Sequence, residues 1–156
     1  ELAQRGAHVV AVDLSRTLVD LARERLPADI GTGHVEFLAG DFLDERLGRF
    51  DWVVAMDSLI HYRPPDAAQA LVRLAPRTRR GIAFTFAPRT PMLAAMHAVG
   101  QLFPRGNRSP AVEPLPEAAV ATQVARALLL AGWRLGRRQR IAEGFYISQA
   151  QELLAP

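Results

Sequence analysis

The sequence predicts an α/β fold with a doubly wound, mostly parallel sheet that ends in an antiparallel hairpin. Short apolar runs alternate with stretches whose apolar residues recur at helical spacing, a pattern typical of consecutive β–α units. The C-terminal part instead holds two strand-like runs, residues 133–141 and 145–154, joined by a short turn. Two such runs with a glycine between them predict a hairpin.

Composition limits the broad class. A length of 156 residues suits a single domain, residues 1–156, that buries a real core. A hydrophobic content of 49% with 22% charged residues excludes an intrinsically disordered chain. The sequence has no Cys, which excludes disulfides and thiolate metal sites within it. It shows no signal peptide and no apolar run of the roughly 20 residues that span a bilayer.

The charge is unevenly distributed. All 19 basic residues are Arg, and from Arg77 onward eleven of them stand against four acidic residues. A positive C-terminal part suits an anionic ligand, a nucleic acid or an acidic lipid surface, but a solvated basic surface explains most of these residues equally well. The sequence has no reading motif with interleaved aromatic residues, so we expect no nucleic-acid partner.

The elements follow in order along the chain. Four apolar runs predict the parallel strands: residues 8–13, 35–40, 50–56 and 80–86. Four helices are expected between and after them: one starting at Ser15, one starting at Asp66, residues 92–102 and residues 118–131. Ser15 and Asp66 are the expected N-caps, whereas Pro27 and Gly132 are the expected stops of the first and last helix. Ala87-Pro88 is expected to end the fourth strand.

Two glycine-containing stretches have structural interpretations. Residues 1–6 resemble the end of a helix followed by its glycine stop, so we expect an upstream piece before Glu1. Residues 31–33 follow a helix and precede a strand. A dinucleotide-binding loop needs the reverse order, so these residues are expected to form a connecting turn.

Carboxylates end two consecutive predicted strands. Asp13 can accept hydrogen bonds from both hydroxyls of a ribose, because a carboxylate offers two acceptor oxygens. Asp41 can accept from an adenine amino group, while the backbone amide at Phe42 meets a ring nitrogen. The alternatives are a helix cap at Asp13 and turn chemistry at Gly40-Asp41. The two carboxylates together favour an adenosine site.

The third strand, residues 50–56, leads directly into Asp57, Ser58, His61 and Tyr62. Ligands of open α/β sheets bind outside the carboxyl ends of the strands, so chemistry is expected here. A lone His is usually structural or solvated, but the position of His61 favours a functional role. Three later arginines are candidate anchors for substrate carboxylates: Arg89, Arg105 and Arg108.

Nearly the whole chain takes part in a resemblance to a known family. The segments that carry it are residues 8–15, 54–62, 84–91, 96–108 and 144–149. They resemble class I S-adenosylmethionine-dependent methyltransferases and, among these, the magnesium-protoporphyrin IX methyltransferase family. Asp13 and Asp41 are generic to the superfamily, whereas residues 57–62 and 103–106 are much more specific.

The resemblance implies a Rossmann-like methyltransferase sheet with S-adenosylmethionine as cofactor. It implies methyl transfer to a propionate carboxylate of Mg-protoporphyrin IX in chlorophyll or bacteriochlorophyll biosynthesis. The family's first strand, its Gly-rich turn and an N-terminal helical region would precede Glu1, so this chain is expected to be the C-terminal portion. The absent strand would lie mid-sheet and leave two unpaired strand edges.

The resemblance also implies roles for individual residues. It assigns the cofactor to residues at three strand ends: Asp13, Leu14, Asp41, Phe42, Met56 and Asp57. It makes His61 the residue that orients the substrate, with Tyr62 in the substrate site. A propionate is already ionised near neutral pH, so the protein mainly aligns it with the methyl carbon and excludes water. The magnesium belongs to the substrate, and no protein metal site is expected.

Partners and location follow from the same resemblance. The porphyrin-binding subunit of magnesium chelatase is a candidate partner, and the expected location is cytoplasmic, with peripheral association at the photosynthetic membrane as a further candidate. Three alternatives remain open: another small-molecule methyltransferase, a nicotinamide-dependent dehydrogenase and a non-catalytic porphyrin-carrying domain. Asp41-Phe42 and the terminal hairpin favour a methyltransferase over a dehydrogenase.

Overall fold

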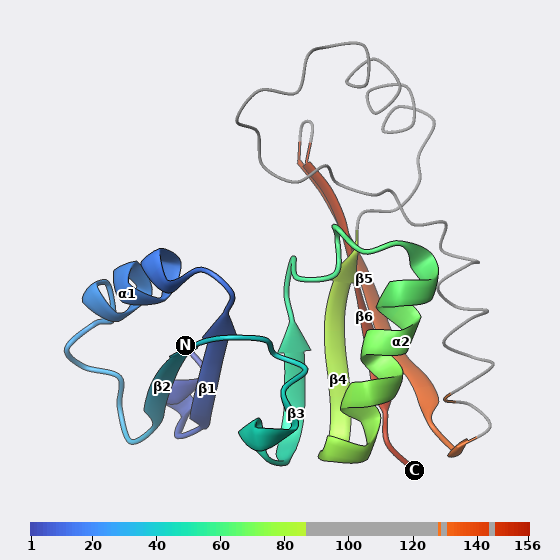
Figure 1. The fold of residues 1–156 in the computed structure, drawn as a ribbon, viewed down its shortest axis with the longest axis horizontal. Helices are drawn as coiled ribbons and strands as arrows, with labels where there is room; N and C mark the ends of the chain where they lie inside the picture. The colour runs from blue at the N-terminus through green and yellow to red at the C-terminus, as the bar shows by residue number, and fades with distance from the viewer. Residues whose placement is uncertain (87–127, 129–130, 144–145) are drawn as a thin grey trace. The chain divides into compact units, whose positions relative to one another are not determined.

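The computed structural model describes residues 1–86, 128, 131–143 and 146–156. The chain divides into two compact units, residues 1–48 and residues 49–156, and each is described by itself. Figure 1 shows their elements. The predicted helix at 92–102, most of the one at 118–131 and the stop at 87–88 lie outside the described residues. Whether the chain is one domain stays a prediction.

The first unit is a β–α–β arrangement. It contains β1 (His8–Asp13), α1 (Arg16–Glu24) and β2 (His34–Ala39), with short 3-10 turns η1 (Ala3–Arg5) and η2 (Glu45–Leu47). The two strands are parallel, in a register that runs from His8 opposite His34 to Asp13 opposite Ala39. This order confirms the two strands and the helix predicted for this part of the sequence.

The start of α1 is the predicted one, and its end is slightly earlier. The Ser15 hydroxyl accepts a hydrogen bond from the Leu18 amide at 3.4 Å, as expected of an N-cap. The helix ends at Glu24 rather than running to Pro27. The residue before a proline is disfavoured in the helical region, so the helix stops before Leu26. Residues 31–33 lie in the turn between α1 and β2, as predicted.

The second unit contains a four-stranded sheet and one described helix. Its elements are β3 (Phe50–Ala55), α2 (Pro64–Leu74), the 3-10 turn η3 (Ala75–Arg77), β4 (Thr78–Phe86), β5 (Arg134–Glu143) and β6 (Tyr146–Leu154). The strand order is β3-β4-β6-β5, with α2 lying against the sheet. β3 and β4 are parallel, whereas β6 runs antiparallel to both β4 and β5. The predicted terminal hairpin is therefore confirmed.

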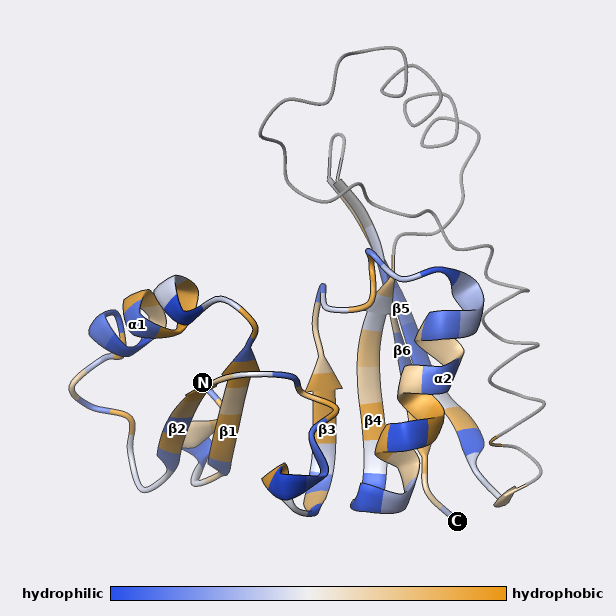
Figure 2. Ribbon diagram, in the orientation of Figure 1, coloured by the Kyte–Doolittle hydropathy of each residue, from blue (hydrophilic) through white to orange (hydrophobic). Residues whose placement is uncertain are grey.

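The described strands form two separately hydrogen-bonded sheets, one per unit. Among the described residues, β1 pairs only with β2, and β3 pairs only with β4. Each therefore has one edge without a strand partner among the described residues. Figure 2 shows apolar residues recurring along β3 and β4, which agrees with the apolar runs that identified these strands.

The start of α2 corrects one prediction. The helix begins at Pro64, and its N-cap is Arg63, which makes no side-chain capping bond. Asp66, the predicted cap, lies inside the first turn, where its carboxylate accepts from Arg63 Nε at 2.8 Å. Pro64 and Pro65 have a fixed φ and no N–H, so they suit the first helical positions and set the start.

The core of the second unit joins its loop, helix and strands. The largest fully buried side chains are Leu59, Leu71, Ile82 and Leu153, each at most 1% exposed. They come from the loop after β3 and from α2, β4 and β6 respectively. Leu59 therefore packs in the hydrophobic core and anchors the loop that contains the candidate functional residues.

Trp52 on β3 lies directly over Gly81 of β4, its partner in the sheet. A Cβ at position 81 would stand 2.5 Å from the indole ring, so only glycine fits beneath it. Trp52 remains 40% exposed, and Val54, on the same face of β3, is 52% exposed. This face of β3 is apolar without being buried in the described structure.

Gly132, the predicted stop of the last helix, lies in a turn of the described structure. Gly132 has a left-handed φ of +82°, and the Trp133 amide donates to the Leu128 carbonyl at 3.0 Å. This is the hydrogen bond of a Schellman motif, in which glycine takes the left-handed position after the helix. The motif turns the chain into β5 and buries Trp133 to 6% exposure.

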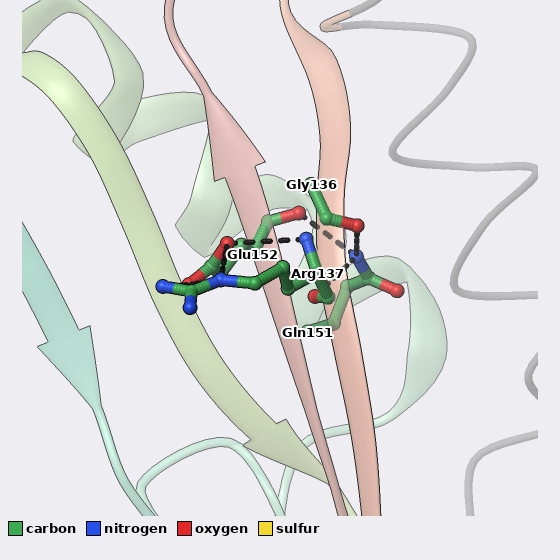
Figure 3. Close-up of polar contacts among 4 residues, drawn as sticks. All are labelled: Gly136, Arg137, Gln151 and Glu152. Atoms are coloured by element: carbon green, nitrogen blue, oxygen red, sulfur yellow. Dashed lines mark hydrogen bonds and ion pairs between the residues drawn. The ribbon is translucent and has the colours of Figure 1, made fainter.

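A bulge in β5 is held by two side chains of β6, as Figure 3 shows. The strand register shifts between Leu135 and Arg138. The Gln151 amide donates to the Gly136 and Arg137 carbonyls, both at 3.3 Å. The Glu152 carboxylate accepts from the Arg137 amide at 3.1 Å and from its guanidinium at 3.0 Å.

The Glu152–Arg137 pair predicts a pH-dependent contribution to stability. The guanidinium and backbone amide of Arg137 lower the pKa of Glu152 below its ordinary value of 4.5. A lowered folded-state pKa stabilises the protein above the ordinary value, and this stabilisation is lost as the pH falls through the folded-state pKa. We therefore expect Glu152→Gln to be less stable than the wild type at pH 7, with the difference shrinking below pH 4.5.

Chemical denaturation at several pH values between pH 3 and pH 7 measures the difference in free energy of unfolding between the two proteins. This range includes the pH at which a glutamate ordinarily titrates. Asp51→Asn is a suitable control, because Asp51 and Arg79 form a longer pair, 3.4 Å, with both side chains about two-thirds exposed. A Glu152→Gln difference that is constant across this pH range would contradict the prediction.

Candidate functional site

The first part of the candidate site is the carboxyl edge of the β1–β2 pair. Asp13 is the last residue of β1 and lies opposite Ala39 of β2. The Gly40 amide donates to the Asp13 carbonyl at 2.9 Å, and Asp41 follows immediately. Parallel pairing therefore brings the two predicted carboxylates to one edge of the sheet.

Both carboxylates also organise their own loops. Asp13 Oδ1 accepts from the Ser15 amide at 2.7 Å, and Asp41 Oδ1 accepts from the Leu43 amide at 2.8 Å. The turn chemistry considered for Asp41 is therefore present, whereas the cap of α1 is Ser15 and not Asp13. Both aspartates are exposed, and neither Oδ2 atom accepts a hydrogen bond from another described residue. One acceptor oxygen of each remains available to a ligand.

Apolar side chains accompany these carboxylates. Leu14, next to Asp13, is 78% exposed, and Phe42, next to Asp41, is half-buried. An exposed apolar surface beside hydrogen-bond acceptors matches the chemistry of a nucleoside, which has a flat ring and polar hydroxyls. The four predicted cofactor residues of this unit are thus gathered at one edge.

The second part of the candidate site is the turn after β3, residues 56–62. Asp57 has a left-handed φ of +50°. Its amide donates to Thr85 Oγ1 at 2.7 Å, and the same hydroxyl donates to Asp57 Oδ1 at 3.0 Å. Thr85 belongs to the neighbouring parallel strand β4, so the sheet itself supports this turn.

Further contacts shape the turn. The Ser58 hydroxyl donates to the Met56 carbonyl at 3.1 Å, and the Tyr62 amide donates to the Leu59 carbonyl at 3.1 Å. While Leu59 is buried, Met56 is 67% exposed and His61 is exposed. The buried Leu59 therefore fixes the turn, while the thioether of Met56 and the imidazole of His61 lie at its surface.

The structure thus gathers the predicted site residues in two groups. Four lie at the β1–β2 edge, and four lie in the turn after β3: Met56, Asp57, His61 and Tyr62. Arg89, Arg105 and Arg108 lie outside the described residues. Thr85 was missed, because a threonine within an apolar strand is an ordinary β-former and gives no signal of its own.

Two further properties bear on the chemistry. Within the described ranges, no group of three or more His, Asp or Glu side chains could hold a metal ion. In the same parts of the chain, no helix is both long and apolar enough to cross a bilayer.

Comparison with known protein families shows which family the chain belongs to. Residues 55–155 match the family described as magnesium-protoporphyrin IX methyltransferase C-terminus, and residues 1–81 match a general methyltransferase domain. The chain belongs to the magnesium-protoporphyrin IX methyltransferase family. The turn after β3, residues 56–62, lies within the specific match, and the β1–β2 edge lies within the general one.

Individual relatives of the chain belong to the same family. The chain is 49% identical over 152 residues to magnesium-protoporphyrin O-methyltransferase of Rhodobacter capsulatus, a match that covers 97% of this chain and 64% of the relative. It is 30% identical over 151 residues to the chloroplastic magnesium protoporphyrin IX methyltransferase of Arabidopsis thaliana, covering 97% of this chain and 47% of that one. The chain therefore spans about half to two-thirds of the length of these family members.

A solved structure of the family confirms the fold. The crystal structure of magnesium protoporphyrin IX methyltransferase from Synechocystis PCC 6803 with bound SAH matches with a TM-score of 0.80 and 27% identity. The match covers 99% of this chain and 67% of that one. The predicted α/β methyltransferase fold, parallel with antiparallel strands near the C-terminus, is confirmed.

Proposed function

We propose that the protein transfers a methyl group from S-adenosylmethionine to a propionate carboxylate of Mg-protoporphyrin IX, a step of chlorophyll or bacteriochlorophyll biosynthesis. The observation that carries this proposal is the match of residues 55–155 to the family's own C-terminal region. That region includes the turn with Asp57 and His61. The family that this region matches is narrower than the general methyltransferase domain that residues 1–81 match.

The β1–β2 edge would hold the cofactor's adenosine. Asp13 Oδ2 would accept from the ribose hydroxyls, and Asp41 would accept from the adenine amino group, with the Phe42 amide donating to a ring nitrogen. Support comes from the acceptor oxygens that these exposed carboxylates keep beyond their own turns. Leu14 would pack against the nucleoside, since it is 78% exposed beside Asp13.

When bound, S-adenosylmethionine supplies an electrophilic methyl group on a sulfonium. Met56 and Asp57 would lie against it, and His61 would orient the substrate by donating an imidazole N–H to the propionate. No base is needed to form the nucleophile, because a carboxylic acid is ionised near neutral pH. The protein's contribution is alignment of the carboxylate oxygen with the methyl carbon and exclusion of water.

The remaining substrate contacts are assigned by charge and position. Tyr62 follows His61 directly and is half-buried, so it would form one wall of the substrate site. Arg89, Arg105 and Arg108 would pair with the porphyrin's carboxylates, since a guanidinium binds a carboxylate through two parallel hydrogen bonds. The magnesium would remain bound by the porphyrin throughout.

A partner and a location complete the proposal. The substrate must come from an enzyme that inserts magnesium into the porphyrin, so the porphyrin-binding subunit of magnesium chelatase is the proposed donor. The proposed location is the cytoplasm, with peripheral association at the photosynthetic membrane. The excess of Arg over acidic residues after Arg77 supports attraction to acidic lipid.

A methylation assay tests the proposed function. The intact protein is incubated with S-adenosylmethionine labelled in its methyl group and with Mg-protoporphyrin IX or metal-free protoporphyrin IX. We expect a labelled monomethyl ester of the magnesium porphyrin. Cofactor binding without this ester would favour another small-molecule methyltransferase, and porphyrin binding without cofactor binding would favour a carrier domain.

A further inference from the structure

The turn after β3 contains a backbone conformation that needs support. Asp57 is the single residue other than glycine with a positive φ in the part of the chain that the structure describes, at +50°. Aspartate tolerates the left-handed region better than most residues, but the conformation is still unfavourable and persists where surrounding contacts hold it. Such residues concentrate at functional sites.

Thr85 supplies that support through a single atom. Its Oγ1 accepts from the Asp57 amide at 2.7 Å and donates to Asp57 Oδ1 at 3.0 Å. The hydroxyl therefore binds the backbone and the side chain of the same residue, using both its acceptor and its donor capacity. This pairing sets the backbone direction and the carboxylate orientation of Asp57 together.

The position of Thr85 is itself well fixed. It lies near the carboxyl end of β4, between Phe84 and Phe86, which are each 3% exposed. Its strand is paired on one side with β3 and on the other with β6, where Thr85 lies opposite Ala150. A β-branched side chain also has restricted rotamers, so the hydroxyl is presented from a rigid support.

We propose that Thr85 is a positioning residue for the cofactor: by holding Asp57 in its left-handed conformation, it sets the path of residues 56–58 where they face the cofactor. The inference rests on the proposed function and deepens it, because it names what shapes the cofactor-facing turn. Alignment of a reacting group is sensitive to displacements of about 1 Å. A hydroxyl that fixes the turn therefore affects cofactor binding without touching the substrate.

The test compares three variants of the intact protein. Thr85→Val keeps a similar shape but removes both hydrogen bonds, whereas Thr85→Ser keeps the hydroxyl. Thr78→Val is the matched control, because Thr78 lies at the opposite end of the same strand and its buried hydroxyl donates to the Leu74 carbonyl at 2.9 Å. Thr78→Val therefore removes a hydroxyl hydrogen bond of β4 far along the strand from the turn.

For Thr85→Val we expect affinity for S-adenosylmethionine to fall about tenfold, in line with the loss of hydrogen bonds that involve a charged group. The KM for the porphyrin should stay near that of the wild type. Thr85→Ser should retain cofactor affinity within about twofold, as expected where the hydroxyl itself is the functional group. Thr78→Val should lower the melting temperature and leave cofactor affinity unchanged.

Amide hydrogen exchange gives a readout that does not depend on activity. Exchange at Asp57 should accelerate in Thr85→Val and stay unchanged in Thr78→Val. Unchanged exchange and affinity in Thr85→Val would overturn the inference, and so would equal losses of affinity in Thr85→Val and Thr78→Val. If the wild type bound no S-adenosylmethionine, both the proposed function and the cofactor role of Thr85 would be wrong. The exchange data would then still show whether the Thr85 hydroxyl holds the turn.

Discussion

Replacing His61 by alanine is expected to lower the turnover of methyl transfer about a hundredfold, the scale of loss when a reacting group is misaligned. Affinity for S-adenosylmethionine should stay close to that of the wild type. His61 is exposed in the turn after β3, and that turn is anchored by the buried Leu59. Its imidazole can therefore be removed without removing the side chain that fixes the turn.

Two comparisons define the role of His61. His61→Asn keeps a hydrogen-bond donor that does not titrate, so it should recover part of the turnover if orientation is what the imidazole supplies. His34→Ala is the matched control, because His34 is also exposed but lies at the start of β2, opposite the carboxyl edge. Steady-state kinetics and cofactor titration measure both effects. Equal losses of turnover and cofactor affinity in His61→Ala would indicate a structural role.

Replacing Asp13 by alanine should mainly weaken cofactor binding, by about 1–3 kcal/mol for a lost charged acceptor, or roughly 5- to 150-fold in the dissociation constant. The carboxylate would lose its contact with the ribose hydroxyls. Turnover at saturating cofactor should change much less, because Asp13 does not contact the reacting carboxylate in the proposed arrangement. Isothermal titration with S-adenosylmethionine measures the affinity.

The loop role of Asp13 needs its own control, because Asp13 Oδ1 also accepts from the Ser15 amide at 2.7 Å. Asp13→Asn retains that acceptor but replaces the other oxygen with an amide group. A loss of affinity in both variants would assign it to the ligand-facing oxygen, whereas a loss in alanine alone would assign it to the loop. Unaltered affinity in both variants would exclude Asp13 from the cofactor site.

Much of the fold could be predicted from the sequence because its strands are short apolar runs with clear ends. The strand at residues 50–56 was predicted to within one residue of the observed β3, Phe50–Ala55. Capping of α1 by Ser15 was also predictable, because a serine before a helical repeat is a local signal. The prediction of Asp66 as a cap was wrong because the two prolines before it start the helix, which places Asp66 in the first turn.

The candidate site was less accessible to sequence analysis. Positions such as Asp13 and Asp41 could be predicted because both follow apolar runs directly, and parallel strands bring such ends to one edge. The pairing of Asp57 with Thr85 could not, because 28 residues separate them and only the register of β3 against β4 makes them neighbours. A threonine within an apolar strand is also an ordinary β-former, so it does not stand out.

The environment of Trp52 over Gly81 has a spectroscopic consequence. The chain's two tryptophans, Trp52 and Trp133, and its two tyrosines, Tyr62 and Tyr146, all lie in the unit formed by residues 49–156. Near-ultraviolet fluorescence from this chain therefore reports on that unit alone. Trp52 is 40% exposed and should be quenched by acrylamide, whereas Trp133, 6% exposed, should be protected and emit at shorter wavelength. The two tryptophan signals therefore follow the unfolding of residues 49–156, the unit that contains both side chains.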